Sequence, residues 1–361
     1  MRLHGIDFLR GLAVTPVIVY HFYILFDFMG DSSFQYLHLF GQIGVSLFFV
    51  ISGFLIYRSV EHSFSTKHKK EALTYYTLHR LFRILPAYYV NLIFVVILFV
   101  FLGEGNLSYL FSLGFIKNLI THLTFSSYFL YQDTGFGING AYWTLHIEML
   151  WYIFVPILFI YLRHNLWLIF LFCLSILYLL SIDLGWITSL FHLNPKASNY
   201  TLILYFFSFQ LPGQLIYFIM GIAIYKSKIS IRLPLIFKLF AFILILLLFI
   251  YFSTLKNDFL ESFILRNSVL LACSTLLFIL FYHVKIRWMQ PIEWLGKISY
   301  SLYLWHMPIL YVMHKLKILS FLSLYSTLVL FIAILLSISS LSYYFIEEGG
   351  FKLRKKMENS L

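Results

Sequence analysis

Charged side chains are scarce in this sequence. Only 11% of its 361 residues are Asp, Glu, Lys or Arg, whereas soluble domains carry about 25%. Hydrophobic residues make up 61%, and the mean hydropathy is +0.86. This balance excludes an ordinary soluble domain. The apolar runs are also too long for a β-barrel, which alternates over segments of about ten residues, so we predict an all-α, polytopic integral membrane protein.

Cysteine is almost absent as well. Cys173 and Cys273 both lie in apolar runs, so they give neither a disulfide framework nor a zinc-binding spacing, and no metal site is predicted. A cleavable secretory signal is also missing, because no small-residue cleavage site follows the run that begins after Arg10. The pI near 9.4 does not indicate nucleic-acid binding, since in a membrane protein the loops that carry the charge matter more.

Long apolar runs fill most of the chain. A membrane-crossing helix needs about 20 apolar residues. Ten segments satisfy this and are predicted spans: 8–28, 40–58, 84–102, 143–162, 166–184, 202–225, 234–254, 265–284, 298–314 and 321–346. The segment 107–131 is interrupted by Gly114, Lys117, Asn118 and His122, so we expect an interfacial or re-entrant helix there.

Positive charge is unevenly distributed among the predicted loops. Six of the 26 lysines and arginines fall on the outer side: Lys117, Lys196, Lys256, Arg266, Lys315 and Lys317. The other 20 face the cytoplasm, as the positive-inside rule requires. Both termini are therefore predicted to be cytoplasmic. Residues 1–347 are expected to form a single membrane-embedded domain, and 348–361 a short basic cytoplasmic tail.

The first span carries ionisable residues that a lipid-facing helix avoids. Arg10 and His21 are eleven residues apart, so they share a helix face and lie about 16 Å apart along the axis. Asp7 precedes Arg10 by three residues and can pair with it. Ionisable groups inside a membrane usually serve a function. The alternative is that Asp7 and Arg10 cap the cytoplasmic end and His21 is a core histidine.

The second and third spans add small and basic residues. Ser52 and Gly53, within 48–55, allow another helix to approach closely, which is also ordinary helix packing. Arg80 and Arg83 are three residues apart and point the same way. Two guanidinium groups suit a phosphate-bearing ligand, although they also fit positive-inside anchoring.

The fourth and ninth spans each carry a polar motif. Trp143 fits the membrane interface, whereas Glu148 lies about one turn inside the span among apolar neighbours. Ser299, Tyr303 and His306 follow one helical face at i, i+4 and i+7. Glu148 enters from the outer side, at a depth similar to that of His21 in the first span, and such a histidine and carboxylate suit a base and its orienting group. The alternative is a structural hydrogen bond between helices.

Together these motifs resemble membrane-bound acyltransferase family 3, the bacterial O-acyltransferases that modify surface polysaccharides. Five family motifs occur in order, and the residues that match them are Arg10 with His21, the Phe-Phe-x-x-Ser-Gly-Phe-Leu run 48–55, Arg80 with Arg83 and Pro86, Trp143 with Glu148, and Gly296, Ser299, Tyr300, Tyr303, Leu304 and His306. Thr144 stands where the family has Ser. Glu347-Glu348-Gly349 stands where the family often has Pro after the acid.

Many family members append a soluble hydrolase-like domain of the SGNH type. Only 348–361 would follow the predicted membrane domain, so we expect the stand-alone form. The resemblance implies a multi-pass O-acetyltransferase of the bacterial inner membrane. It implies acetyl-CoA (acyl-CoA) as co-substrate, with no permanently bound cofactor, and as acceptor a hydroxyl of a lipid-linked or surface glycan such as lipopolysaccharide O-antigen or capsule.

The same resemblance assigns roles to the motif residues. The coenzyme A phosphates are expected at Arg10, Arg80 and Arg83, with helices closing around the thioester at Ser52 and Gly53. His21 is the expected general base, oriented by Glu148 or His306, and a covalent acyl-histidine is the variant. The supporting residues are Asp7, Ser299, Tyr303 and Trp143.

Two other classes of function stay open. The same ionisable residues could serve a transporter or flippase of a lipid-linked sugar, or a non-catalytic scaffold of the same family. The first would move substrate without consuming a thioester, and the second would be indifferent to substitution of His21. A small secondary metabolite is the alternative acceptor.

Overall fold

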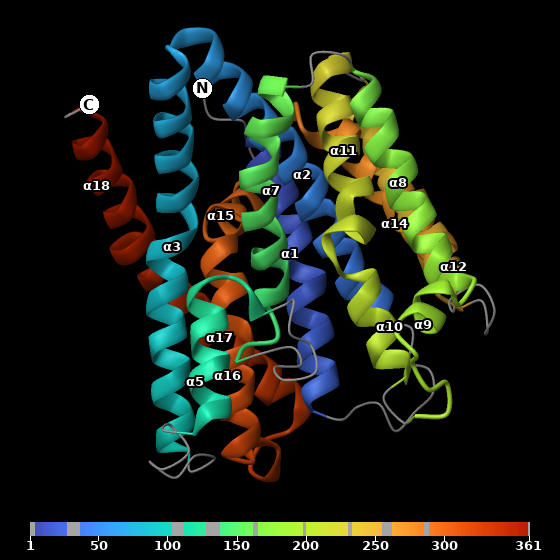
Figure 1. Cartoon of the computed structure of the whole chain (residues 1–361). Coiled ribbons are helices and arrows are strands. Elements are labelled where there is room, and N and C mark those ends of the chain that lie inside the picture. Colours follow the sequence, from blue (N-terminus) through green and yellow to red (C-terminus); the bar gives the residue numbers. More distant parts are fainter. Residues whose placement is uncertain are drawn as a thin grey trace. The chain divides into compact units, whose positions relative to one another are not determined.

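The structure is a computed structural model that describes residues 4–26, 37–102, 112–127, 138–161, 165–197, 200–229, 233–254, 262–284 and 289–359. All regular secondary structure in these residues is helical (Figure 1). A backbone in lipid must satisfy its own hydrogen bonds, and a helix does so within one segment. The long runs of Leu, Ile and Phe therefore fold as helices, and the prediction of an all-α, polytopic membrane protein is confirmed.

Eight described helices are long and apolar enough to cross a membrane. They are α1 (His4–Leu25), α2 (Leu37–Thr66), α3 (Lys69–Phe101), α7 (Tyr142–Tyr161), α8 (Leu166–Asp183), α10 with α11 (Tyr200–Ser208 and Leu211–Ser227), α14 (Phe263–Phe281), and α17 (Leu324–Leu341) with its continuation. The other two predicted spans, 234–254 and 298–314, coincide with α12 (Leu235–Thr254) and α16 (Ser299–Lys315). The apolar stretch of α12, Leu235–Tyr251, is shorter, and α16 has 17 residues.

The segment expected to be interfacial or re-entrant contains α5 (Leu113–Leu123). Ser112 caps this helix by accepting the N–H of Phe115 at 3.2 Å. With 11 residues, α5 is shorter than the roughly 20 that a span requires. Residues 107–111 and 128–131 of this segment lie outside the described residues, as do Lys256 of the outer charge set and the last two residues of the predicted tail.

Contacts divide the chain into two compact units. The first comprises Met1–Val17, Ser32–Ser59 and Val155–Lys297, and the second Ile18–Asp31, Val60–Phe154 and Ile298–Leu361. Helices α1, α2 and α7 contribute residues to both units.

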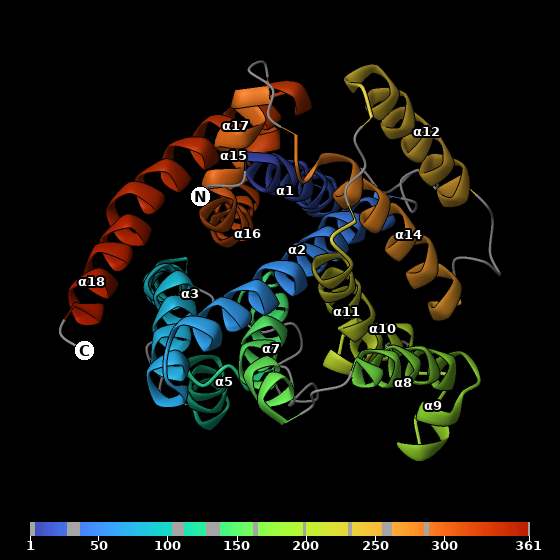
Figure 2. The ribbon, with the colours of Figure 1, turned by 90° about the horizontal axis from the view of Figure 1, so that it is seen from above.

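In the first unit, α8 packs against α11 and α14, and α12 packs against α14 (Figure 2). Gly53 of α2 lies against the backbone of α11, because a Cβ there would come within 2.1 Å of the carbonyl oxygen of Phe218. Gly221 of α11 lies equally close to the carbonyl oxygen of Val50. The small residues of the 48–55 motif therefore serve a close contact between helices.

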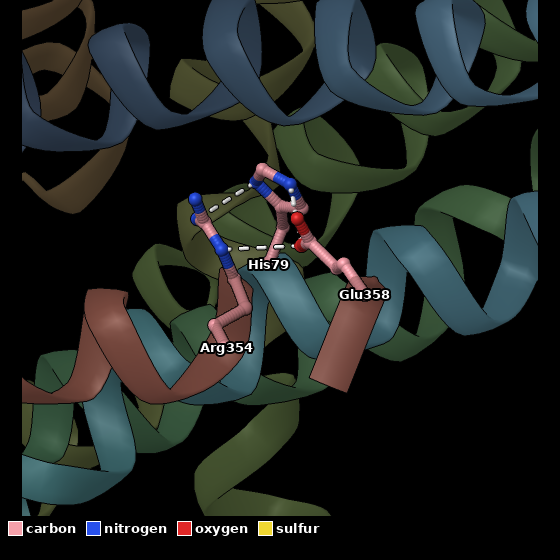
Figure 3. A network of polar contacts seen from close by, with 3 residues as sticks. All are labelled: His79, Arg354 and Glu358. Carbon is pink, nitrogen blue, oxygen red and sulfur yellow. Dashed lines mark hydrogen bonds and ion pairs between the residues drawn. The ribbon is translucent and has the colours of Figure 1, made fainter. Parts of the chain in front are cut away.

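In the second unit, α16 packs against α3 and α17. Helix α17 continues through η6 (Ser342–Glu347), a π-helix, into α18 (Glu348–Glu358). Most of the predicted basic tail is thus a helix, and it packs against α3. His79 of α3 lies 2.9 Å from both Arg354 Nη1 and Glu358 Oε1 (Figure 3), so polar contacts hold this helix in place.

Candidate active site

Two histidines from distant parts of the sequence meet in the second unit. Nε2 of His306, on α16, lies 3.3 Å from Nδ1 of His21, on α1, and their ring centroids are 5.0 Å apart. His306 is fully buried. A stacked contact between Phe22 and Phe331 packs the next residue of α1 against α17. The first and ninth predicted spans therefore bring their histidines together.

The hydrogen bonds around this pair define which ring nitrogens carry protons. Nδ1 of His306 lies 2.7 Å from the carbonyl oxygen of Tyr303, which only accepts, so Nδ1 is the donor. In a neutral ring Nε2 of His306 then accepts, and it receives the Nδ1 proton of His21. His21 keeps a lone pair on Nε2, which is what a general base or nucleophile requires.

Proline 308 shapes the helix that carries His306. Pro308 has no N–H, so the carbonyl of Leu304 loses its usual helical partner. The side chain of Asn139 donates to this carbonyl at 3.2 Å. Asn139, just before α7, is thereby bonded to α16 two residues from His306.

A second bond links α16 to α7. Thr144 Oγ1 donates to the phenol oxygen of Tyr303 at 2.8 Å, and both side chains are buried. The ring of Tyr303 lies 5.6 Å from that of His306. Thr144, which replaces the Ser of the family pattern, keeps the hydroxyl that makes this contact.

Buried polar residues hold α5 beside α3 and α7. His122 donates from Nδ1 to the carbonyl of Asn118 at 2.8 Å and accepts the N–H of Ile138 at Nε2 at 3.2 Å. Burial lowers the pKa of His122 below 6.5, and the bond to Asn118 opposes this only in part. The neutral ring therefore fits its two partners. Tyr88 of α3 adds a bond from its phenol to the carbonyl of His122 at 3.0 Å.

Arg80 and Arg83 of α3 and Glu148 of α7 belong to one group of interacting side chains. The guanidinium of Arg80 stands 5.8 Å from the ring centroid of Tyr76 and 5.6 Å from that of Tyr152. Tyr152 donates its phenol proton to Glu148 at 2.8 Å. Arg83 interacts electrostatically with the same carboxylate. We define this group of side chains as the arginine cluster: Tyr76, Arg80, Arg83, Glu148 and Tyr152.

His306 and Glu148, the two residues predicted to orient His21, thus lie in different surroundings. His306 contacts His21 directly. Glu148 contacts Tyr152, one helical turn along α7, and belongs to the arginine cluster. Sequence reasoning did not include Tyr76 or Tyr152. Their spacing of four residues from Arg80 and Glu148 is the signal that could have found them.

The residues predicted near the N-terminus lie in the first unit. Arg10 pairs with Asp7 at 3.7 Å, as their spacing predicts. Gly296 packs against this turn of α1, because a Cβ there would clash with the carbonyl oxygen of Asp7. Trp143 lies in the first turn of α7 and Ser299 begins α16, and their orienting roles stay predictions. Among the described residues, no three His, Cys, Asp or Glu side chains are grouped to hold a metal.

The sequence as a whole decides the family. Residues 3–346 match a family described as "Acyltransferase domain". The chain belongs to this acyltransferase family. The match includes every motif residue from Arg10 to His306, so the histidine pair and the arginine cluster are both built from the acyltransferase segment.

Curated relatives of this acyltransferase chain are similar at low identity. Peptidoglycan O-acetyltransferase OatA of Listeria monocytogenes is 27% identical over 326 residues, which are 85% of this chain and 49% of the relative. O-acetyltransferase OatA of Staphylococcus aureus is 28% identical over 380 residues, 97% of this chain and 58% of the relative. The chain spans about half the length of these relatives. No solved structure matches it significantly.

Proposed function

We propose that the protein is a membrane O-acetyltransferase that moves an acetyl group from acetyl-CoA to a hydroxyl of a cell-wall or cell-surface glycan. Its acyltransferase family and the names of its relatives support this reaction class. The observation that carries the proposal is the histidine pair, because its hydrogen bonds put the proton of neutral His21 on Nδ1 and so make Nε2 the basic nitrogen.

The proposed step is a transfer with one base. Nε2 of His21 removes the proton of the acceptor hydroxyl while the hydroxyl oxygen attacks the thioester carbonyl. The carbon–sulfur bond then breaks, and the departing coenzyme A thiolate takes the proton from His21. His306 holds the ring of His21 and stabilises the charge that forms on it, as the orienting member of a catalytic triad does.

The donor phosphates are proposed to bind at the arginine motif. Arginine binds phosphate in a bidentate manner, and the rings of Tyr76 and Tyr152 hold the Arg80 guanidinium in one place. The phosphate-binding role of Arg10, eleven residues before His21 on α1, stays a prediction from the sequence. With the termini on the cytoplasmic side of a bacterial inner membrane, the donor would enter from the cytoplasm.

The test uses the purified full chain in lipid nanodiscs with [¹⁴C]acetyl-CoA and isolated peptidoglycan glycan strands. We expect release of free coenzyme A, measured as thiol, together with radioactivity in the glycan as base-labile ester. A transporter would bind or move sugar without releasing the thiol. Glycan that carries no label while acetyl-CoA stays intact would therefore contradict the proposal. Label retained on the protein after rapid denaturation at neutral pH would indicate the acyl-histidine variant.

A further inference from the structure

Glu347 is a buried carboxylate that the mechanism above does not use. Only 4% of its surface is exposed, and Ser301 of α16 donates a hydrogen bond to its Oε1 at 2.5 Å. Ser342, at the start of the π-helix, lies 2.9 Å from the same Ser301 hydroxyl. Burying a carboxylate is costly unless it is paired and hydrogen-bonded. This position therefore calls for a positively charged partner.

The π-helix explains how Glu347 reaches the interior. In an α-helix, five residues rotate the side chain by about 140° beyond a full turn, so Glu347 would point away from the face of Ser342. In the π-helix η6 the bonds run from i to i+5, which brings the fifth residue back beneath the first. Ser342 and Glu347 are accordingly both buried. The π-helix replaces the regular hydrogen bonds of an α-helix between residues four apart, and its effect is to direct the carboxylate of Glu347 inward.

The positive partner is Arg83. Both Glu347 and Glu148 interact electrostatically with its guanidinium, as does the phenol of Tyr300. Tyr300 is itself fixed by a bond from its phenol to the carbonyl of Ile84 at 2.8 Å. Arg83, predicted from the sequence as a phosphate ligand or a positive-inside anchor, thus also interacts electrostatically with two carboxylates from different helices.

The residues that follow Glu347 keep to the same side of α3. Gly350 lies against Phe82 and Pro86, because a Cβ there would come within 2.9 Å of the Pro86 ring. One turn further, Arg354 and Glu358 contact His79 (Figure 3). The contacted positions 79, 82, 83 and 86 form one stripe of α3 at helical spacing. The C-terminal helix α18 therefore packs along the face of α3 that carries Arg83.

We propose that Glu347 is a positioning residue for donor binding: it fixes the guanidinium of Arg83, and through Glu148 and Tyr152 it sets the place of Arg80. This inference rests on the proposed function. The family pattern has an acid at this place, but neither that resemblance nor the matched segment 3–346 assigns Glu347 this role. The alternative role is a simple local charge, which would repel the donor phosphates rather than help to bind them.

The variant Glu347→Gln separates these roles, with Glu348→Gln as the matched control on the adjacent carboxylate. For acetyl-CoA we expect KM to rise about tenfold in Glu347→Gln, with kcat changed less than twofold, since a charge-assisted contact is lost from a binding residue. Glu348→Gln should match the wild type. A KM that stays constant or falls in Glu347→Gln would overturn the positioning role.

Two further variants keep the test decisive if Glu347→Gln folds poorly. Ser301→Ala retains the carboxylate but removes its bond, and we expect KM to rise about threefold. In a background of Arg83→Gln, adding Glu347→Gln should change KM less than twofold, because its target is already gone. An unchanged KM in Ser301→Ala, or additive effects in the double variant, would refute the inference.

A readout without turnover distinguishes failure of this inference from failure of the proposed function. If the wild type releases no coenzyme A thiol, the proposed function is wrong. The shifts in thermal-unfolding temperature of Arg83→Gln, Glu347→Gln and the double variant then decide whether the contact exists. Non-additive shifts support the contact, and additive shifts overturn it.

Discussion

The histidine pair and the arginine cluster, both in the second unit, are held by different forces. His306 is fixed by a backbone carbonyl and a second imidazole, so its partners carry no formal charge in the arrangement described. Arg83 interacts electrostatically with two carboxylates, and Arg80 lies against aromatic rings. The difference supports the proposed division of work, in which neutral groups hold a base for proton transfer and charged groups bind an anionic donor.

The proposed division agrees with the surroundings of Glu148, which contacts Tyr152 in the arginine cluster. A carboxylate beside the histidine pair would favour the protonated imidazole and remove the free base. In the arginine cluster the same carboxylate balances a guanidinium instead. Changes at the histidine pair should therefore lower kcat, whereas changes at the arginines should raise the donor KM.

The largest expected effect comes from His21→Ala. Removing the proposed base should lower acetyl transfer by about 100-fold or more, the usual worth of general base catalysis. The measurement is the rate of coenzyme A release by protein shown to be monodisperse in detergent. His192→Ala, at an exposed histidine, is the control and should keep the wild-type rate. Full activity in His21→Ala would remove this residue from the chemistry.

His306→Ala should be the next most damaging change. The ring of His21 loses the acceptor that orients it, and kcat should fall about 10- to 100-fold, in the range seen when a group that orients the base is removed. The donor KM should hardly change. Steady-state kinetics with varied acetyl-CoA give both values. A rise in KM at constant kcat would place His306 in donor binding instead.

Arg80→Gln changes the arginine cluster and should affect the donor KM rather than kcat. Loss of a charge-assisted phosphate contact should raise the donor KM about tenfold and leave kcat within twofold. Arg80→Lys keeps the charge but not the bidentate geometry, so it should lie between Arg80→Gln and the wild type. A loss confined to kcat in Arg80→Gln would contradict the proposed division.

Thr144→Val should give a smaller loss. The hydroxyl bonded to Tyr303 is removed while the shape is kept, so we expect kcat to fall about threefold to tenfold, the usual effect of one lost neutral hydrogen bond. Thr144→Ser restores the hydroxyl found in the family pattern and should stay within twofold of the wild type. Equal losses in both variants would show that packing, not the hydrogen bond, matters here.

The smallest expected effect concerns pH and lies outside both groups. Because burial lowers the pKa of His122 below 6.5, the unfolded chain binds more protons there than the folded chain under mildly acidic conditions. The contribution of His122 to stability should therefore be present at pH 7 and decline as the pH falls below 6.5. Thermal unfolding of His122→Asn should show a weaker decline between pH 7 and pH 5 than the wild type, and an equal decline would contradict this origin.

Much of the helical framework follows from the sequence. Apolar runs define where helices must form, and the i, i+3 spacing correctly pairs Asp7 with Arg10. The helical period also places Tyr303 and His306 on one side of α16, where their rings are in contact. These are local relations, which depend on residues a few positions apart.

Contacts between residues on different helices could not be predicted from such local spacings. His21 and His306 are separated by 285 positions, and no periodicity says that they meet. Glu148 bonds to Tyr152 of its own helix, but only the packing of α7 beside α3 brings the ring of Tyr152 to the guanidinium of Arg80. The inward turn of Glu347 depends on a π-helix, which breaks the α-helical period on which the sequence prediction relies.

The most direct test of the division between the two groups compares Arg80→Gln with His21→Ala over a full range of acetyl-CoA concentrations. Arg80→Gln should reach nearly the wild-type rate when acetyl-CoA is saturating, because only donor binding is impaired. His21→Ala should stay near the background rate at every donor concentration. A transfer rate of His21→Ala that excess donor restores, or a rate of Arg80→Gln that stays low at saturating donor, would contradict the proposed division.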